Sequence, residues 1–151
     1  MTFLYFEDFA VGQKYLGSER FVLDAAAIKS FAAAYDPEPF HLEEAAAHRN
    51  PALRGLTASG WHTASITMRL LVRSALRPMG GILGLGVDEI RWPRPVRPGD
   101  ELRVETEVVE LRASQSRPAH GIVKIRTTTF NQANESVQFL VSNILVEKRA
   151  G

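Results

Sequence analysis

The chain has 151 residues, a length that suits one domain able to bury a core of its own. Its composition, 45% hydrophobic and 23% charged, is typical of a globular protein and argues against disorder or a fibre. Lys and Arg number 18 against 17 Asp and Glu, so a net charge of +1 offers no broad surface for nucleic acid. Without cysteine, the chain has no disulfides, thiolate zinc sites or thiol nucleophiles, so chemistry must come from histidine, carboxylates and backbone.

The first residues, MTFLYFEDFAVGQKY, include acidic side chains and lack the uninterrupted apolar run of a secretory leader. No later segment approaches the ~18 apolar residues that a membrane span needs. We therefore expect a cytoplasmic protein, one domain over residues 1–151, that binds neither membranes nor nucleic acid.

Residues 24–35, DAAAIKSFAAAY, have the pattern of a short amphipathic helix. Asp24 is a good N-cap residue, and Ile28, Phe31 and Tyr35 recur three and four positions apart on one face. The spacing predicts a helix that ends where the prolines begin.

The segment YDPEPFH, residues 35–41, places an aspartate and a histidine on a stiff bend. Pro37 and Pro39 fix two φ angles and push the residue before each of them towards extended geometry. The chain is predicted to turn sharply here, with Asp36 and His41 held in a fixed relationship.

Two further helices are expected before the middle of the chain. Residues 42–49 suit one or two turns, and residues 60–76 suit a long helix capped by Ser59 or a near neighbour and stopped by Pro78. The apolar stripe predicted for the long helix consists of Ala64, Met68, Leu71, Val72, Ala75 and Leu76.

Beyond Gly86 the pattern changes to the alternation of β-strands. Residues 100–112 place Leu102, Val104, Thr106 and Val108 on one face and charges on the other. Residues 119–130 alternate similarly, and residues 137–148 are apolar on both faces, as a central or interface strand would be. Strands at 87–92 and 100–147 are predicted to form an antiparallel meander crossed by the long helix, which makes the fold class α+β.

Asp36 and His41 are candidates for proton transfer, because a carboxylate and an imidazole held together can orient and polarise one water molecule. The structural alternative is an aspartate in a proline turn and a histidine that caps or packs. Gly60, in TASGWHTAS, opens the long helix, where free backbone N–H groups and the positive end of the helix dipole can bind an oxyanion. The alternative is a glycine that only permits close packing.

Arg91, Arg94 and Arg97 crowd the proline-rich segment at 92–100, where a planar guanidinium suits phosphate recognition. A solvated strand edge kept soluble by charge is the alternative. His41 and Glu44 share helical spacing, but no third ligand accompanies them, so no metal site is expected.

Three aromatic side chains receive structural interpretations. His62 is interpreted as packed at the start of the long helix, and Trp92 and Phe139 as core residues.

The order of Asp36, Pro39 and His41, then SGW at a helix start, then RWPRPVRPGDEL, resembles the MaoC-like dehydratases, the (R)-specific enoyl-CoA hydratases of the hot-dog fold. The early FEDFAVGQKY segment resembles that family's opening too, so the likeness covers nearly the whole chain. The chain departs from the family pattern at Glu38, where asparagine is common, and at Ser59, where histidine is common.

The resemblance implies a long central helix wrapped by a curved antiparallel β-sheet, and a homodimer with a tunnel for an acyl-CoA thioester. Asp36 and His41 would be the catalytic pair and the Gly60 N–H the oxyanion donor. Ser59, Trp61, Arg94 and Arg97 are expected to bind substrate, with coenzyme A entering only as part of it and no cofactor.

The first hypothesis is thus an enoyl-CoA hydratase, or 3-hydroxyacyl-CoA dehydratase, of fatty acid metabolism. A hot-dog acyl-CoA thioesterase and a catalytically silent acyl-CoA-binding subunit remain alternatives. The sequence leaves open which of Asp36 and His41 is the base, and the length, branching and charge of the acyl group.

Overall fold

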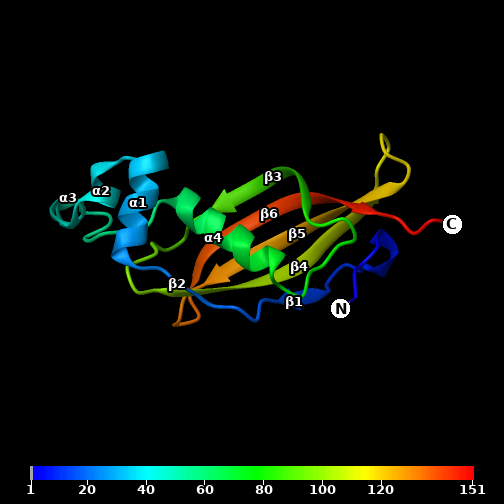
Figure 1. The fold of residues 1–151 in the computed structure, drawn as a ribbon, viewed down its shortest axis with the longest axis horizontal. Helices are drawn as coiled ribbons and strands as arrows, with labels where there is room; N and C mark the ends of the chain where they lie inside the picture. Colours follow the sequence, from blue (N-terminus) through cyan, green and yellow to red (C-terminus); the bar gives the residue numbers. More distant parts are fainter. Residues whose placement is uncertain (1) are drawn as a thin grey trace.

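In the computed structural model, which describes residues 2–151, an antiparallel sheet carries one long helix across a face (Figure 1). The strand order is β1-β4-β5-β6-β3, and β2 also pairs with β4. This arrangement agrees with the predicted α+β class. The strands are β1 (Lys14–Leu16), β2 (Phe21–Val22), β3 (Leu83–Arg91), β4 (Glu101–Ala113), β5 (His120–Phe130) and β6 (Ser136–Glu147).

Helices α1, α2 and α3 gather at one end of the sheet, α4 crosses it, and η1 and both termini lie at the opposite end (Figure 1). Asp24 caps the first of them, its Oδ1 accepting the Ala27 N–H at 2.8 Å, as predicted. No helix within residues 2–151 is long and apolar enough to cross a membrane. The helical elements are η1 (Phe6–Asp8), α1 (Ala25–Tyr35), α2 (Pro39–Leu42), α3 (Glu44–Arg49) and α4 (Gly60–Val72).

Strand β4 follows the predicted alternation, because one face of it lies on the core. Leu102, Val104, Thr106 and Val108 are all at most 1% exposed, whereas the residues between them are partly open to solvent. The meander β4-β5-β6 is also confirmed, and β6 pairs with both β5 and β3, so it is the central kind of strand that was predicted.

Helix α4 differs from the prediction in both its length and its buried face. It ends at Val72, and its side against the core carries Thr63 and Thr67 beside apolar residues. Met68 and Val72, predicted to lie in the buried stripe, are 43% and 53% exposed. Thr67 can be buried because its hydroxyl has a partner in the sheet, Thr129 Oγ1 at 2.6 Å. Side-chain hydrophobicity alone therefore missed the threonines, although Leu71 and Leu76 of the predicted stripe are buried.

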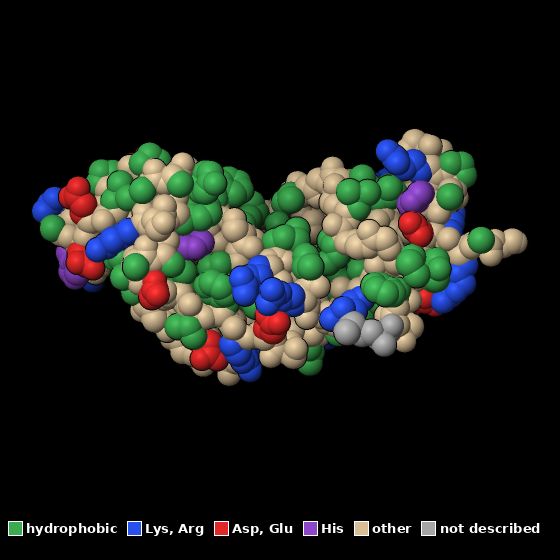
Figure 2. Space-filling view, in the orientation of Figure 1, with side chains coloured by type: hydrophobic (Ala, Val, Ile, Leu, Met, Phe, Trp, Pro, Cys, Tyr) green, Lys and Arg blue, Asp and Glu red, His purple; other side chains and the backbone are tan. Residues whose placement is uncertain are grey.

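Strand β3 lies at the edge of the sheet beside β6, and not next to β4 as a meander in chain order would have placed it. The segment after it, residues 92–100, therefore crosses from one side of the sheet to the other. Leu83, Leu85 and Val87 on this edge strand are each more than half exposed. Figure 2 shows hydrophobic side chains gathered along this side of the molecule, near β3 and α4.

Candidate active site

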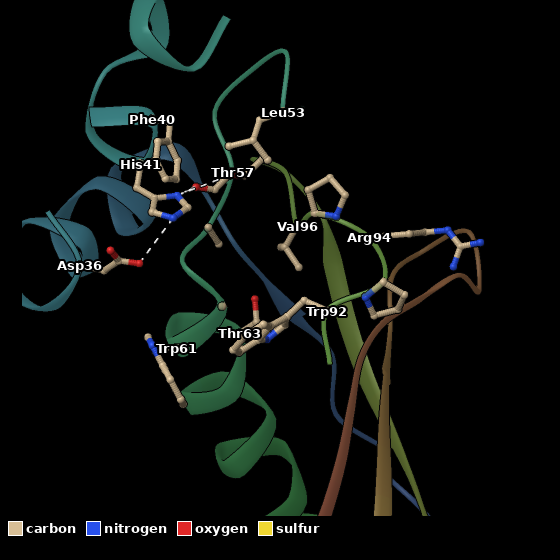
Figure 3. A pocket seen from close by; sticks show the side chains of 14 residues that line it. Asp36, Phe40, His41, Leu53, Thr57, Trp61, Thr63, Trp92, Arg94 and Val96 are labelled. Carbon is tan, nitrogen blue, oxygen red and sulfur yellow. Dashed lines mark hydrogen bonds and ion pairs between the residues drawn. The ribbon is translucent and has the colours of Figure 1, made fainter. Parts of the chain in front are cut away.

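A cavity of about 350 Å³ lies where the α1–α2 bend, the start of α4 and the segment after β3 meet (Figure 3). Its wall is mostly apolar, and a few polar groups converge on it, which is the usual character of a small-molecule site. The lining residues include Asp36, Phe40, His41, Thr57, Gly60, Trp61, Thr63, Trp92, Arg94 and Val96.

Asp36 and His41 approach each other on this wall because the two prolines shape the bend as predicted. Pro39 is the first residue of the short helix α2, which carries His41, and the His41 N–H donates to the Glu38 carbonyl at 2.9 Å. Asp36 is the C-cap residue of α1. His41 Nε2 lies 3.5 Å from Asp36 Oδ2 (Figure 3).

The opposite nitrogen of the imidazole fixes the position of its proton. His41 Nδ1 lies 2.6 Å from the Thr57 carbonyl oxygen, which can only accept, so Nδ1 carries the hydrogen. In the neutral ring Nε2 is then an acceptor that faces the acceptor oxygens of Asp36. The 3.5 Å separation exceeds a good hydrogen bond, so the two groups are free to bind a common donor.

Gly60 opens α4 beside this pair. A Cβ at this position would lie 2.5 Å from Cε2 of Trp92, so only glycine fits without moving the indole. Ser59 Oγ accepts the Trp61 N–H, and the Ser59 carbonyl accepts from His62 and Thr63, but no acceptor within residues 2–151 takes the Gly60 N–H. That N–H, with about half a positive charge from the helix dipole, is available to an anionic oxygen.

The remaining predicted binding residues divide into two groups. Trp61 and Arg94 line the cavity. Ser59 is fully buried as the helix cap, and Arg97 lines a separate hollow while its guanidinium donates to the Leu53 carbonyl. The structure thus joins Trp61 and Arg94 to the catalytic candidates and gives Ser59 and Arg97 supporting positions.

Trp92 and Phe139 are not the core residues that the sequence suggested. Trp92 is 41% exposed and lines the cavity, because it follows the edge strand where Pro93 prevents further pairing. Phe139 is half-buried and borders a hollow with Arg126 on the sheet face. The tryptophan immediately before the prolines of residues 93–98 was the feature that could have located this wall from the sequence.

His62 packs as expected, with its ring stacked on Phe31 at a centroid distance of 4.4 Å and an interplanar angle of 3°. Burial lowers the pKa of His62, because the imidazolium form loses solvation. Its Nδ1 has no hydrogen-bond partner within the described part of the chain. The arrangement is that of a neutral ring in the packing at the start of α4.

A family model described as MaoC like domain matches residues 8–131. The chain belongs to the MaoC-like domain family. Asp36, His41 and Gly60 all lie within the matched span. The family resemblance, the hot-dog fold and the hydro-lyase class of enzyme are confirmed for this MaoC-like chain.

Solved structures of similar proteins cover almost all of this MaoC-like chain. A MaoC-like dehydratase from Rhodospirillum rubrum is 49% identical, with a TM-score of 0.91 over 98% of this chain and 99% of that one. The R-hydratase PhaJ1 from Pseudomonas aeruginosa is 27% identical, with a TM-score of 0.72 over 96% of this chain and 86% of that one.

Mesaconyl-CoA hydratase from Cereibacter sphaeroides is 41% identical over 71 residues. These residues make up 47% of this chain and 20% of that protein. The chain therefore spans a fraction of that relative's length, and the two share a segment rather than a whole architecture.

Proposed function

We propose that this MaoC-like chain catalyses the reversible addition of water to 2-enoyl-CoA thioesters. One observation carries the proposal: two acceptor atoms, Asp36 Oδ2 and His41 Nε2, face each other 3.5 Å apart on a cavity wall that also includes Gly60 and its free N–H. The hydratases among its relatives support the same reaction class.

The two acceptors suit one water molecule, which can donate a hydrogen to each and turn a lone pair towards the cavity. In the proposed reaction the water oxygen bonds to C3 of the enoyl group while the pair takes one of its protons. The electrons of the C2–C3 double bond move towards the thioester, and the same pair returns the proton to C2. Syn addition of one water is the net result, and the pair is regenerated.

Gly60 is proposed to donate its N–H to the thioester oxygen, on which negative charge builds as C3 is attacked. One such donor typically contributes about 10²–10³ in rate, and acid–base help about 10²–10⁴, so an efficient hydratase needs both. Side chains and backbone supply the base, the acid and the oxyanion donor, so the proposal requires no metal or cofactor.

The wild-type reaction with crotonyl-CoA tests this proposal. Loss of the conjugated double bond with formation of 3-hydroxybutanoyl-CoA, and without release of free thiol, is the expected result. Thiol release from saturated acyl-CoA would identify a thioesterase instead. Binding with neither reaction would identify a silent acyl-CoA-binding subunit.

Two further proposals concern coenzyme A binding and the oligomeric state. Arg94 lies at the cavity wall with an exposed guanidinium that contacts Glu135 at 3.4 Å, and a phosphate of coenzyme A can replace that exposed partner.

The chain is also proposed to act as a homodimer. Among the described residues β3 is the last strand of the sheet, and on it Leu83, Leu85 and Val87 are exposed.

A further inference from the structure

Trp92 is held from two sides at the cavity wall. Its ring lies against Gly60, where a Cβ would come within 2.5 Å, and its indole Nε1–H donates to Gln138 Oε1 at 2.9 Å. The edge of the indole also meets Trp61, with ring centroids 5.5 Å apart and planes at 80°. Trp92 and Thr63 both line the cavity that His41 lines (Figure 3).

Behind the indole a chain of buried hydrogen bonds joins the helix to the sheet. Gln138 Nε2 donates to Thr67 Oγ1 at 2.9 Å, and Thr67 Oγ1 lies 2.6 Å from Thr129 Oγ1. Gln138 on β6, Thr67 on α4 and Thr129 on β5 are all 0% exposed. Because an indole N–H only donates, it fixes which end of the Gln138 amide faces Trp92.

This chain of hydrogen bonds lies just beyond the cavity along α4, since Thr67 is about one helical turn after Thr63, which lines the cavity. A longer acyl group that continued between helix and sheet would meet the indole first. It would then have to separate three buried polar side chains that have no solvent to replace their partners, which is unfavourable.

We propose that Trp92, positioned by Gln138, is the floor of the acyl pocket and restricts the substrate to short acyl groups. Gln138 acts through the indole and does not touch the substrate. The inference rests on the proposed acyl-CoA site and adds the acyl length to it.

The test is calorimetric binding of two saturated thioesters, butanoyl-CoA and decanoyl-CoA, which undergo no hydration. Wild type is expected to bind butanoyl-CoA about tenfold more tightly or better, since rejecting even one methylene can contribute about tenfold. Trp92→Ala should open the floor and improve the relative affinity for decanoyl-CoA by about tenfold. Gln138→Leu and Trp92→Phe each remove the hydrogen bond between the indole and Gln138. They should shift the ratio of the two affinities in the same direction, but by less.

Thr127→Val is the matched control, because Thr127 and Thr106 form another buried hydroxyl pair in the sheet, 3.0 Å apart, away from the cavity. It should leave the affinity ratio unchanged, whatever it does to the melting temperature. Equal wild-type affinities, no binding of either thioester, or an unchanged ratio in folded Gln138→Leu and Trp92→Phe would overturn the inference. Failure of the hydratase proposal would appear separately, as absent crotonyl-CoA turnover with the binding preference intact.

Discussion

His41 Nε2 faces Asp36 Oδ2 at 3.5 Å while its Nδ1 is committed to the Thr57 carbonyl at 2.6 Å. The backbone at Thr57 therefore decides which nitrogen of the ring can take part in chemistry. The carboxylate and the imidazole come from a single bend, but the proton on the ring is set by a different segment.

Removing either member of this pair should impair hydration while leaving the fold in place. Asp36→Asn and His41→Ala are each expected to lower kcat for crotonyl-CoA by about 10²–10⁴, the usual contribution of acid–base catalysis. Circular dichroism checks the fold, and His48→Gln, an exposed histidine on α3, is the control that should retain activity. Near wild-type rates in both folded variants would contradict the proposed roles.

Gly60→Ala should lower both stability and activity, because the new methyl group lies where the Trp92 indole now packs. Overpacking of this kind typically costs about 1–3 kcal/mol, measurable from urea unfolding. Combining Gly60→Ala with Trp92→Ala should recover much of the lost stability, because substitutions at two residues in contact are coupled. Gly84→Ala is the control, since a Cβ there meets nothing within 4 Å and stability should barely change.

Stability should fall in mild acid because of His62. Burial lowers its folded-state pKa below the ordinary 6.5, so between these two values the unfolded chain binds a proton that the folded chain does not. The free energy of unfolding should therefore rise with pH across that window, and the contribution of His62 should be lost as pH falls below 6.5. Urea midpoints at several pH values should show a shallower dependence for His62→Gln, whereas His48→Gln should keep the wild-type slope.

The two arginines after β3 should separate in their effects. Arg94→Ala is expected to weaken coenzyme A binding by roughly twofold to fivefold, a modest effect because the side chain is exposed. Arg97→Ala should instead lower the melting temperature, since its guanidinium holds the Leu53 carbonyl. Calorimetry and thermal unfolding on both variants check this, and equal loss of affinity in the two would refute the division.

A lysine on the edge strand should break the proposed homodimer. Leu85→Lys places a charge among exposed apolar side chains and should yield a monomer by light scattering. Val11→Lys, at an apolar residue that is 64% exposed in a turn, is the control and should not change the mass. A monomeric wild type would end the dimer proposal.

Local patterns carried most of the correct predictions. Asp24 predicted the start of α1, the two prolines predicted the bend, and the alternation around Val104 predicted β4. Each of these features depends on residues that are close together in the chain. Asp36, His41 and Gly60 were proposed from local patterns together with the family resemblance, and the structure brings them to one cavity.

What the sequence did not give depends on distant partners. Thr67 is buried only because Thr129 and Gln138 meet its hydroxyl across the core, which no helical periodicity can reveal. Trp92 was predicted to be a core residue, but the order of strands leaves it at an edge, over the cavity. The split between Arg94 and Arg97 likewise follows from loop geometry.

The pairing of β3 with β6 has a consequence for biosynthesis. An apolar segment that leaves the ribosome in mid-chain must wait for Ser136–Glu147 before its backbone groups find their native partners. During that interval the nascent chain exposes an unpaired apolar strand, and chains in this state tend to aggregate or to bind chaperones. Slowing translation between these two strands should therefore reduce soluble yield more than slowing it after β6.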